Sequence, residues 1–158
     1  MKRILKIVLL GVMLFSTASC GCKKDPDPIT LEDAQYTSAG EGRLEYMETF
    51  DLVQSKIDSK ANFVFYMYGA TCSGCTAFSP ILKEYAKEKG IIVYTVEVNA
   101  VTRANKELKE AMGWTPAVGI FKDGELYQNI HGLGSGQKEF FQSKEGFGSW
   151  FEKYVVLK

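Results

Sequence analysis

The stretch Tyr68-Gly69-Ala70-Thr71-Cys72-Ser73-Gly74-Cys75 decides how the rest of the chain is interpreted. It connects an apolar run at 63–68 to a run of helical character at 76–86. Two cysteines three positions apart, at a strand end and a helix start, suit reversible dithiol–disulfide chemistry. The free N–H groups and positive dipole end of a helix favour a thiolate, which makes Cys72 the better nucleophile. Cys75, one helical turn later, is placed to resolve a mixed disulfide.

The N-terminus has the parts of a secretory signal. Three basic residues stand in the first six positions, residues 7–15 are apolar, and small residues lead to Cys20. The apolar part is too short for a comfortable membrane span. The segment resembles bacterial lipoprotein signals, which implies cleavage before Cys20 and lipidation of that residue, with palmitate among the acyl groups. The alternatives are plain secretion with a Cys20–Cys22 disulfide, or free thiols at both positions.

We therefore divide the chain into a signal peptide at 1–19, a tether at 20–42 and one domain at 43–158. The hydrophobic content of 46% and the charged content of 24% fit a globular fold. The 19 basic residues are scattered and balanced by 19 acidic ones, so nothing indicates a nucleic-acid partner. An exported chain meets an oxidising environment, where a dithiol needs electrons supplied from elsewhere.

Residue patterns predict an α/β domain. Residues 62–68 are almost all aromatic or β-branched, as in a strand that helices cover on both faces. Asp123-Gly124 is a strong hairpin signal, which predicts antiparallel pairing, whereas strand–helix–strand units predict parallel pairing. We expect strands at 44–48, 62–68, 91–98, 117–121 and 126–131, and helices at 49–59, from Cys75 to Lys89, at 103–112 and at 137–157, with Gly146 and Gly148 as candidate breaks in the last.

With these elements, residues 43–157 resemble the thioredoxin-like superfamily. Pro80 lies five residues after Cys75, where that superfamily has its helix-kinking proline, and Pro116 lies 41 residues after Cys75, where it has a cis-proline. Phe121-Lys122-Asp123-Gly124-Glu125 resembles its hairpin, and Gly132 resembles the glycine after its last strand. The resemblance implies a thioredoxin fold, with a mixed central sheet flanked by helices on both faces.

The resemblance also implies roles for individual residues. Cys72 would be the attacking thiolate and Cys75 the resolving thiol, alternating between dithiol and disulfide without a cofactor. The backbone of Thr115, set by cis-Pro116, would pair with a substrate strand. On a chain with a signal segment, the run at 69–75 resembles bacteriocin transport accessory proteins and lipid-anchored extracytoplasmic thiol-disulfide reductases.

Three departures from the thioredoxin pattern concern proton handling and redox potential. Thr71 stands where thioredoxins have Trp, and Ser73-Gly74 replaces Gly-Pro, which alters the helix start and the redox potential. Tyr66 occupies the position of the buried acid, six residues before Cys72. Glu97, near the end of a neighbouring strand, is therefore a candidate general base for Cys75. The alternative is that Glu97 is a solvated residue at a strand end.

Other candidate residues have simpler interpretations. Tyr68 and Trp114 should lie near the dithiol, where both could line a groove for a partner. Zinc is not expected, because it needs two further ligands and the only histidine is His131. His131 could serve a catalytic cysteine, but we favour a surface position at the end of the last strand, because a thioredoxin-like fold already explains the cysteines. A purely structural disulfide would constrain very little chain.

These observations favour an enzyme: a membrane-tethered, extracytoplasmic thiol-disulfide oxidoreductase that reduces disulfides of proteins or peptides. It would act as a monomer and receive electrons from a membrane partner. A disulfide-forming oxidase is the enzymatic alternative. The other class is a thioredoxin-like binding lipoprotein that assists export of a secreted peptide and for which the dithiol is dispensable.

Overall fold

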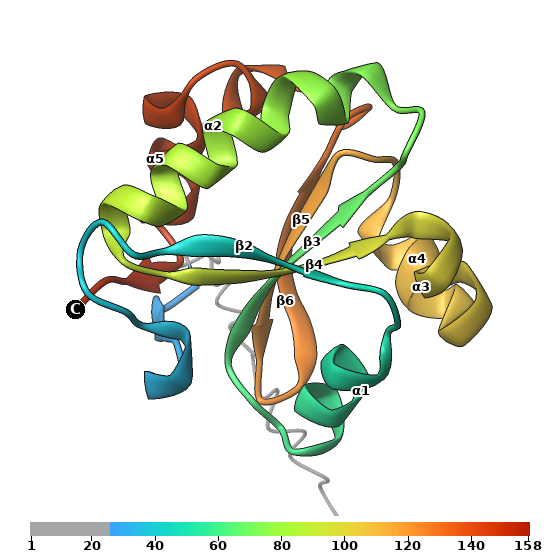
Figure 1. The fold of residues 1–158 in the computed structure, drawn as a ribbon, viewed down its shortest axis with the longest axis horizontal. Coiled ribbons are helices and arrows are strands. Elements are labelled where there is room, and N and C mark those ends of the chain that lie inside the picture. The colour runs from blue at the N-terminus through green and yellow to red at the C-terminus, as the bar shows by residue number, and fades with distance from the viewer. Residues whose placement is uncertain (1–25) are drawn as a thin grey trace, which may run out of the picture.

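The computed structural model describes residues 26–158, in which a five-stranded sheet is packed between two layers of helices (Figure 1). The predicted signal peptide and Cys20 lie outside the described residues. Five strands make the sheet, in the order β2 (Arg43–Met47), β4 (Ile92–Glu97), β3 (Phe63–Tyr68), β5 (Ala117–Lys122) and β6 (Glu125–His131).

The pairing of the strands confirms the predicted mixed sheet. Strands β2, β4 and β3 run parallel, β5 runs antiparallel to β3, and β6 runs antiparallel to β5. Asp123 and Gly124 connect β5 to β6 with φ angles of 52° and 78°. Both values lie in the left-handed region that a two-residue hairpin of this type requires.

Strand β3 has the continuous apolar sequence that a central strand needs, because helices cover both of its faces. Val64 and Tyr66 face the cluster formed with α2 (Ser73–Lys89) and α5 (Lys144–Phe151). Phe63, Phe65 and Met67 face the other cluster. The helices that cover this second cluster are α1 (Asp51–Asp58), α3 (Val98–Ala104) and α4 (Lys106–Met112).

The helix predicted at 103–112 is two helices, α3 and α4, and α3 begins directly after β4. Asn105 separates them because its side chain accepts a hydrogen bond from the Leu108 N–H at 2.9 Å and caps α4. The expected strand at 91–98 therefore ends at Glu97, which caps α3.

The helix predicted at 137–157 is also divided. It consists of a 3-10 helix η2 (Lys138–Phe141), then α5, then the short strand β7 (Val155–Val156). Ser143 causes the first interruption, since its hydroxyl accepts a hydrogen bond from the Gly146 N–H at 2.9 Å and starts α5. The glycines proposed as breaks lie inside α5, where Gly148 lets Tyr85 approach closely.

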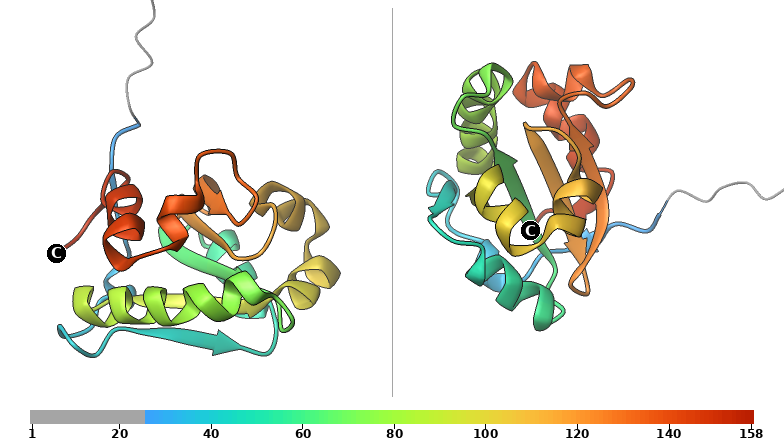
Figure 2. Two further views of the ribbon diagram at one scale, coloured as in Figure 1. Left: turned by 90° about the horizontal axis from the view of Figure 1, so that it is seen from above. Right: turned by 90° about the vertical axis from the view of Figure 1, so that its right-hand side faces the viewer.

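The described part of the predicted tether packs against the domain. Strand β1 (Ile29–Thr30) pairs in parallel with β7, and a 3-10 helix η1 (Asp33–Gln35) follows. Figure 2 shows this N-terminal segment beside the C-terminal one. Ile29 and Leu31 are buried because they complete the apolar cluster beneath α5. The packed domain therefore begins near residue 29, ahead of the boundary predicted at 43.

Within residues 26–158, no helix is both long enough and apolar enough to span a membrane.

Candidate active site

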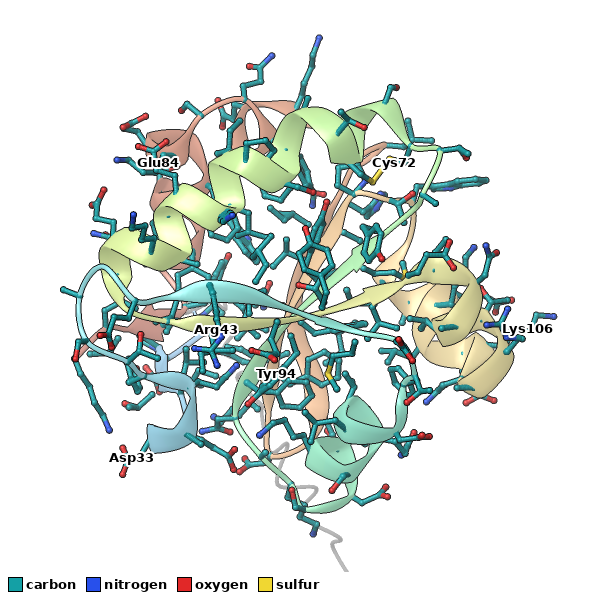
Figure 3. The ribbon with its side chains drawn as sticks, in the orientation of Figure 1. Asp33, Arg43, Cys72, Glu84, Tyr94 and Lys106 are labelled. Carbon is teal, nitrogen blue, oxygen red and sulfur yellow. A yellow bond between two sulfur atoms is a disulfide. The ribbon has the colours of Figure 1, made fainter. Side chains whose placement is uncertain are left out.

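The start of α2 holds the two cysteines at the end of the sheet where β3 stops (Figure 3). Cys72 is the N-cap residue of α2, and its Sγ accepts a hydrogen bond from the Cys75 N–H at 3.1 Å. The Gly69 N–H donates to the Cys75 Sγ at 3.4 Å. Cys72 and Cys75 form a disulfide with a Cα–Cα distance of 5.2 Å. Backbone donors therefore point at both sulfurs.

The two cysteines differ in access to solvent. Cys75 is 3% exposed, whereas Cys72 is only half-buried. A partner can therefore reach the Cys72 sulfur, while Cys75 lies underneath it. This asymmetry is what an attacking and a resolving cysteine require.

A cis peptide bond joins Thr115 to Pro116, as the resemblance implied. The Gly132 N–H donates to the carbonyls of Trp114 at 3.0 Å and Pro116 at 2.8 Å, which ties this loop to the end of β6. A Cβ on Gly74 would lie 3.1 Å from Pro116 Cδ, so the helix start and the proline are in close contact. The absence of side chains at Gly74 and Gly132 permits this approach.

Tyr66, at the position of the thioredoxin acid, is fully buried beneath the site. Its hydroxyl lies 3.0 Å from the Ser79 Oγ, one helical turn beyond Cys75 on the same side of α2. Burial raises the pKa of Tyr66 to about 12. At neutral pH this side chain is therefore an uncharged hydrogen-bonding group and not a base.

Glu97 is paired in register with Tyr68, and Tyr68 lies shortly before Cys72 in the sequence. Its Oε2 accepts from the Asn99 N–H at 3.1 Å, and its Oε1 accepts from the Asn99 Nδ2 at 2.9 Å. Among the hydrogen bonds of the described residues, none joins Glu97 to Cys75. Its observed interactions are those of an N-cap residue.

Tyr68 ends β3 and Trp114 directly precedes the Thr115–Pro116 cis bond, so both lie at the dithiol end of the sheet. The half-buried Tyr68 ring meets the ring of Tyr46 edge-on at 5.6 Å, and burial, first of all, raises the pKa of Tyr68. Trp114 is 61% exposed, with the Lys109 Nζ 5.2 Å from its ring centre. Sequence reasoning missed Tyr46 because its distance from the cysteines along the chain gives no signal without the strand register.

Among the hydrogen bonds of the described residues, none joins His131 to Cys72 or Cys75. Its ring packs on the backbone of Gly113, where a Cβ would lie 2.7 Å from the ring, and its Nδ1 is buried without a partner. The half-buried ring ends β6, next to the loop that precedes Pro116. Among residues 26–158, no three His, Cys, Asp or Glu side chains are grouped so that they could hold a metal ion.

The sheet order, the two helical layers and a disulfide at the start of α2 opposite a cis-proline define the thioredoxin fold, and solved structures agree. Thioredoxin O1 from Arabidopsis thaliana is 21% identical with a TM-score of 0.52, over 73% of this chain and 100% of that chain. A mutant thioredoxin from Halobacterium salinarum is 20% identical with a TM-score of 0.52, over 77% and 98%. Malassezia sympodialis thioredoxin is 13% identical with a TM-score of 0.58, over 77% and 98%. No family model matches the chain.

Proposed function

We propose that this chain is a thiol-disulfide oxidoreductase that reduces disulfides in proteins or peptides outside the cytoplasm. The observation that carries the proposal is the pair of sulfurs at the start of α2, one accessible and one buried, each accepting a backbone N–H. Those donors and the helix dipole favour the thiolate form of a reduced cysteine at this position.

The reaction has two exchange steps. The Cys72 thiolate attacks one sulfur of the substrate disulfide, forming a mixed disulfide, and the other substrate sulfur leaves as a thiolate that takes up a proton. The Cys75 thiolate then attacks the Cys72 sulfur and releases the second substrate thiol. Two electrons have passed to the substrate, and the chain ends with the Cys72–Cys75 disulfide. A dithiol protein at the membrane returns the electrons by the same exchange in reverse.

Exposed apolar side chains around the dithiol favour a macromolecular substrate. Tyr46 is 56% exposed, Trp114 61% and Leu133 71%, and each lies at the end of the sheet that carries Cys72. Apolar surface of this kind at a reactive centre is typical of sites that bind proteins. The backbone of Thr115, beside cis-Pro116, is the edge to which an extended substrate segment would pair.

Insulin reduction tests the activity. With dithiothreitol as the donor, the wild-type domain should precipitate insulin chains faster than dithiothreitol alone, and Cys72→Ser should abolish the acceleration. Reduced Cys75→Ser, mixed with insulin after removal of dithiothreitol, should instead accumulate a mixed disulfide with insulin, because the resolving thiol is missing. No acceleration by the wild type, with unchanged peptide secretion in Cys72→Ser cells, would leave the accessory binding protein as the better account.

The reduction potential decides the direction. A reductase should have a potential near about −270 mV and a disulfide-forming oxidase one near about −120 mV. Equilibration of the Cys72–Cys75 pair with glutathione and dithiothreitol buffers measures it, and we expect a value on the reducing side. A strongly oxidising value would make the oxidase the better assignment.

We further propose that the chain is a lipoprotein anchored through Cys20 to the outer side of a bacterial cell membrane. The N-terminal sequence supports this, since small residues and then a cysteine follow a basic and an apolar segment. In cells fed labelled palmitate, the full-length chain should incorporate label. Cys20→Ala should lose it and Cys22→Ala should keep it; label that survives Cys20→Ala would overturn the anchor.

A further inference from the structure

A pocket of about 250 Å³ adjoins the dithiol on the side of η2. Its walls come from the first turn of α2, the cis-proline, the end of β6 and η2. The lining residues are Gly74, Ala77, Pro116, Gly132, Lys138, Phe141 and Gln142. A Cβ on Gly74 would lie 3.9 Å from the Cys72 Sγ, so the pocket begins beside the sulfur that a substrate must reach.

The wall formed by η2 is held in place by the core. Phe141 meets Phe78 edge-on at 4.8 Å, and Phe78 is fully buried. The loop before η2 is fixed as well, because the Gln137 Oε1 accepts from the His131 N–H at 2.9 Å and the Gln137 N–H donates to Gly134 O at 3.2 Å. The pocket is therefore a formed feature of the folded chain.

The chemistry of the lining indicates what fits. Ala77, Pro116 and Phe141 present apolar surface, and the volume is below the roughly 300–1,000 Å³ of small-molecule sites. It suits one apolar side chain. Lys138 is exposed and belongs to none of the salt bridges among the described residues.

We propose that this pocket selects substrates: it receives an apolar side chain adjacent to the attacked cysteine, and Lys138 pairs with a carboxylate one position further along. The preferred substrate is thus an extended segment with an apolar residue beside its disulfide and an acidic residue next to that. This inference rests on the proposed reductase function. Ala77, Lys138 and Phe141 act as specificity residues and leave the exchange chemistry to Cys72 and Cys75.

Peptide competition tests the selectivity. The substrates are peptides with one cysteine in a disulfide with 2-mercaptoethanol, carrying Leu or Ala beside the cysteine and Asp or Lys one position beyond. Hydroxyethyl disulfide, which has neither side chain, reports the bare exchange reaction. We expect the wild type to favour the Leu–Asp peptide over the Ala–Lys peptide by roughly tenfold or more in kcat/KM.

Two variants and two matched controls assign that preference to the pocket. Ala77→Leu fills the pocket from an exposed helix position and should remove the preference for Leu, while Lys138→Glu should shift the Asp-to-Lys ratio by roughly threefold toward Lys. Ala111→Leu on α4 and Lys153→Glu after α5 make the same changes away from the pocket and should behave as wild type. The two control variants should reduce hydroxyethyl disulfide at the wild-type rate, and for Ala77→Leu and Lys138→Glu the preference is measured as the ratio of kcat/KM between two peptides within the same variant.

The outcomes distinguish a failure of the pocket inference from a failure of the proposed reductase function. If the wild type reduces hydroxyethyl disulfide but treats all the peptides alike, the pocket inference is wrong and the reductase stands. Equal preference in wild type and Lys138→Glu also overturns the acidic component, even if Ala77→Leu fails to fold by circular dichroism. A wild type that reduces neither kind of substrate overturns the reductase and the selectivity together.

Discussion

Backbone N–H groups donate hydrogen bonds to the two sulfurs, and neutral Tyr66 stands at the position where thioredoxins have a buried acid. The N–H groups of Cys75 and Gly69 point at the Cys72 and Cys75 sulfurs, and Tyr66 is held neutral next to Ser79. Amide donors stabilise a thiolate without titrating themselves. The exchange reaction should therefore depend on pH mainly through the cysteines, which Glu97→Gln tests, while Tyr66→Phe tests whether the Tyr66 hydroxyl is a buried neutral group.

Glu97→Gln should leave the pH–rate profile of disulfide reduction unchanged. The carboxylate is engaged by Asn99 at the start of α3, and a general base must lie within hydrogen-bond reach of the proton it takes. The substitution should instead lower the free energy of unfolding by about 0.5–1 kcal/mol, since it weakens a helix cap. Urea titration measures that loss, with the exposed Glu110→Gln as control. A profile displaced in Glu97→Gln alone would restore Glu97 as the base.

Tyr66→Phe should change how stability depends on pH above pH 10. Below pH 10 a tyrosine is neutral in both states, so Tyr66→Phe loses only the Ser79 hydrogen bond, about 1 kcal/mol. As pH rises from 10 to 12, an unfolded tyrosine loses its proton while folded Tyr66, whose pKa is about 12, keeps it. Wild-type stability therefore falls in this window by up to about 2–3 kcal/mol relative to Tyr66→Phe.

Urea titrations at a series of alkaline pH values measure this difference. Tyr46→Phe, at an exposed position on the same sheet, is the matched control and should track the wild type. A stability difference between Tyr66→Phe and wild type that stays constant from pH 8 to 12 would contradict the assignment of Tyr66 as a buried neutral group.

At the scale of elements, local sequence signals predict those parts of the fold that local residues determine. The apolar run of β3, the Asp123-Gly124 turn and the Gly90 cap of α2 each depend on nearby residues, and each lies where it was expected. The position of the cysteine pair at a helix start and the cis bond before Pro116 were also predictable, because the resemblance to thioredoxins rests on the spacing of these residues. The pairing of β1 with β7 was not, since it joins residues that are far apart in sequence.

The pocket beside η2 was likewise not predictable from local sequence signals. Its residues come from four separate segments of the chain, and the 3-10 helix that forms one wall replaces part of a predicted continuous helix. Ser143 carries a local signal for this division, as an N-cap residue that starts α5. The preference of serine for N-cap positions predicts a new helix at Ser143 only if the turn before it is already known not to belong to the same helix.

Leu31→Ala tests whether β1 and its flanking residues belong to the domain. Leu31 is 3% exposed and packs in the cluster under α5, so truncation should lower the free energy of unfolding by about 2–4 kcal/mol. Thr30→Ala, one position earlier and exposed, removes no buried group and should change stability little. Thermal or urea unfolding compares the two. Equal stability of Leu31→Ala and wild type would mean that this segment belongs to the tether and not to the packed domain.

In the whole molecule, the N-terminal segment and the dithiol lie at opposite ends of β3. The Glu32 N–H donates to Asn62 O at the start of that strand, whereas Cys72 follows its end. Figure 3 shows Asp33 and Cys72 on opposite sides of the domain. An attachment through the N-terminus therefore holds the domain by the end that carries none of the candidate site residues. For the lipid anchor we propose, this would turn Cys72 toward partners away from the bilayer.

Surface immobilisation tests whether this polarity matters for activity. A domain that begins at Pro26 and is bound to beads through an added N-terminal biotin should keep most of its insulin-reducing activity, because the dithiol end stays open. A domain bound through a biotin on a cysteine introduced as Lys109→Cys, beside Trp114, should lose insulin reduction but still reduce hydroxyethyl disulfide. Free domains carrying each label serve as controls. If N-terminal attachment blocks insulin and Lys109 attachment does not, proteins approach from the β1 end and the proposed orientation is wrong.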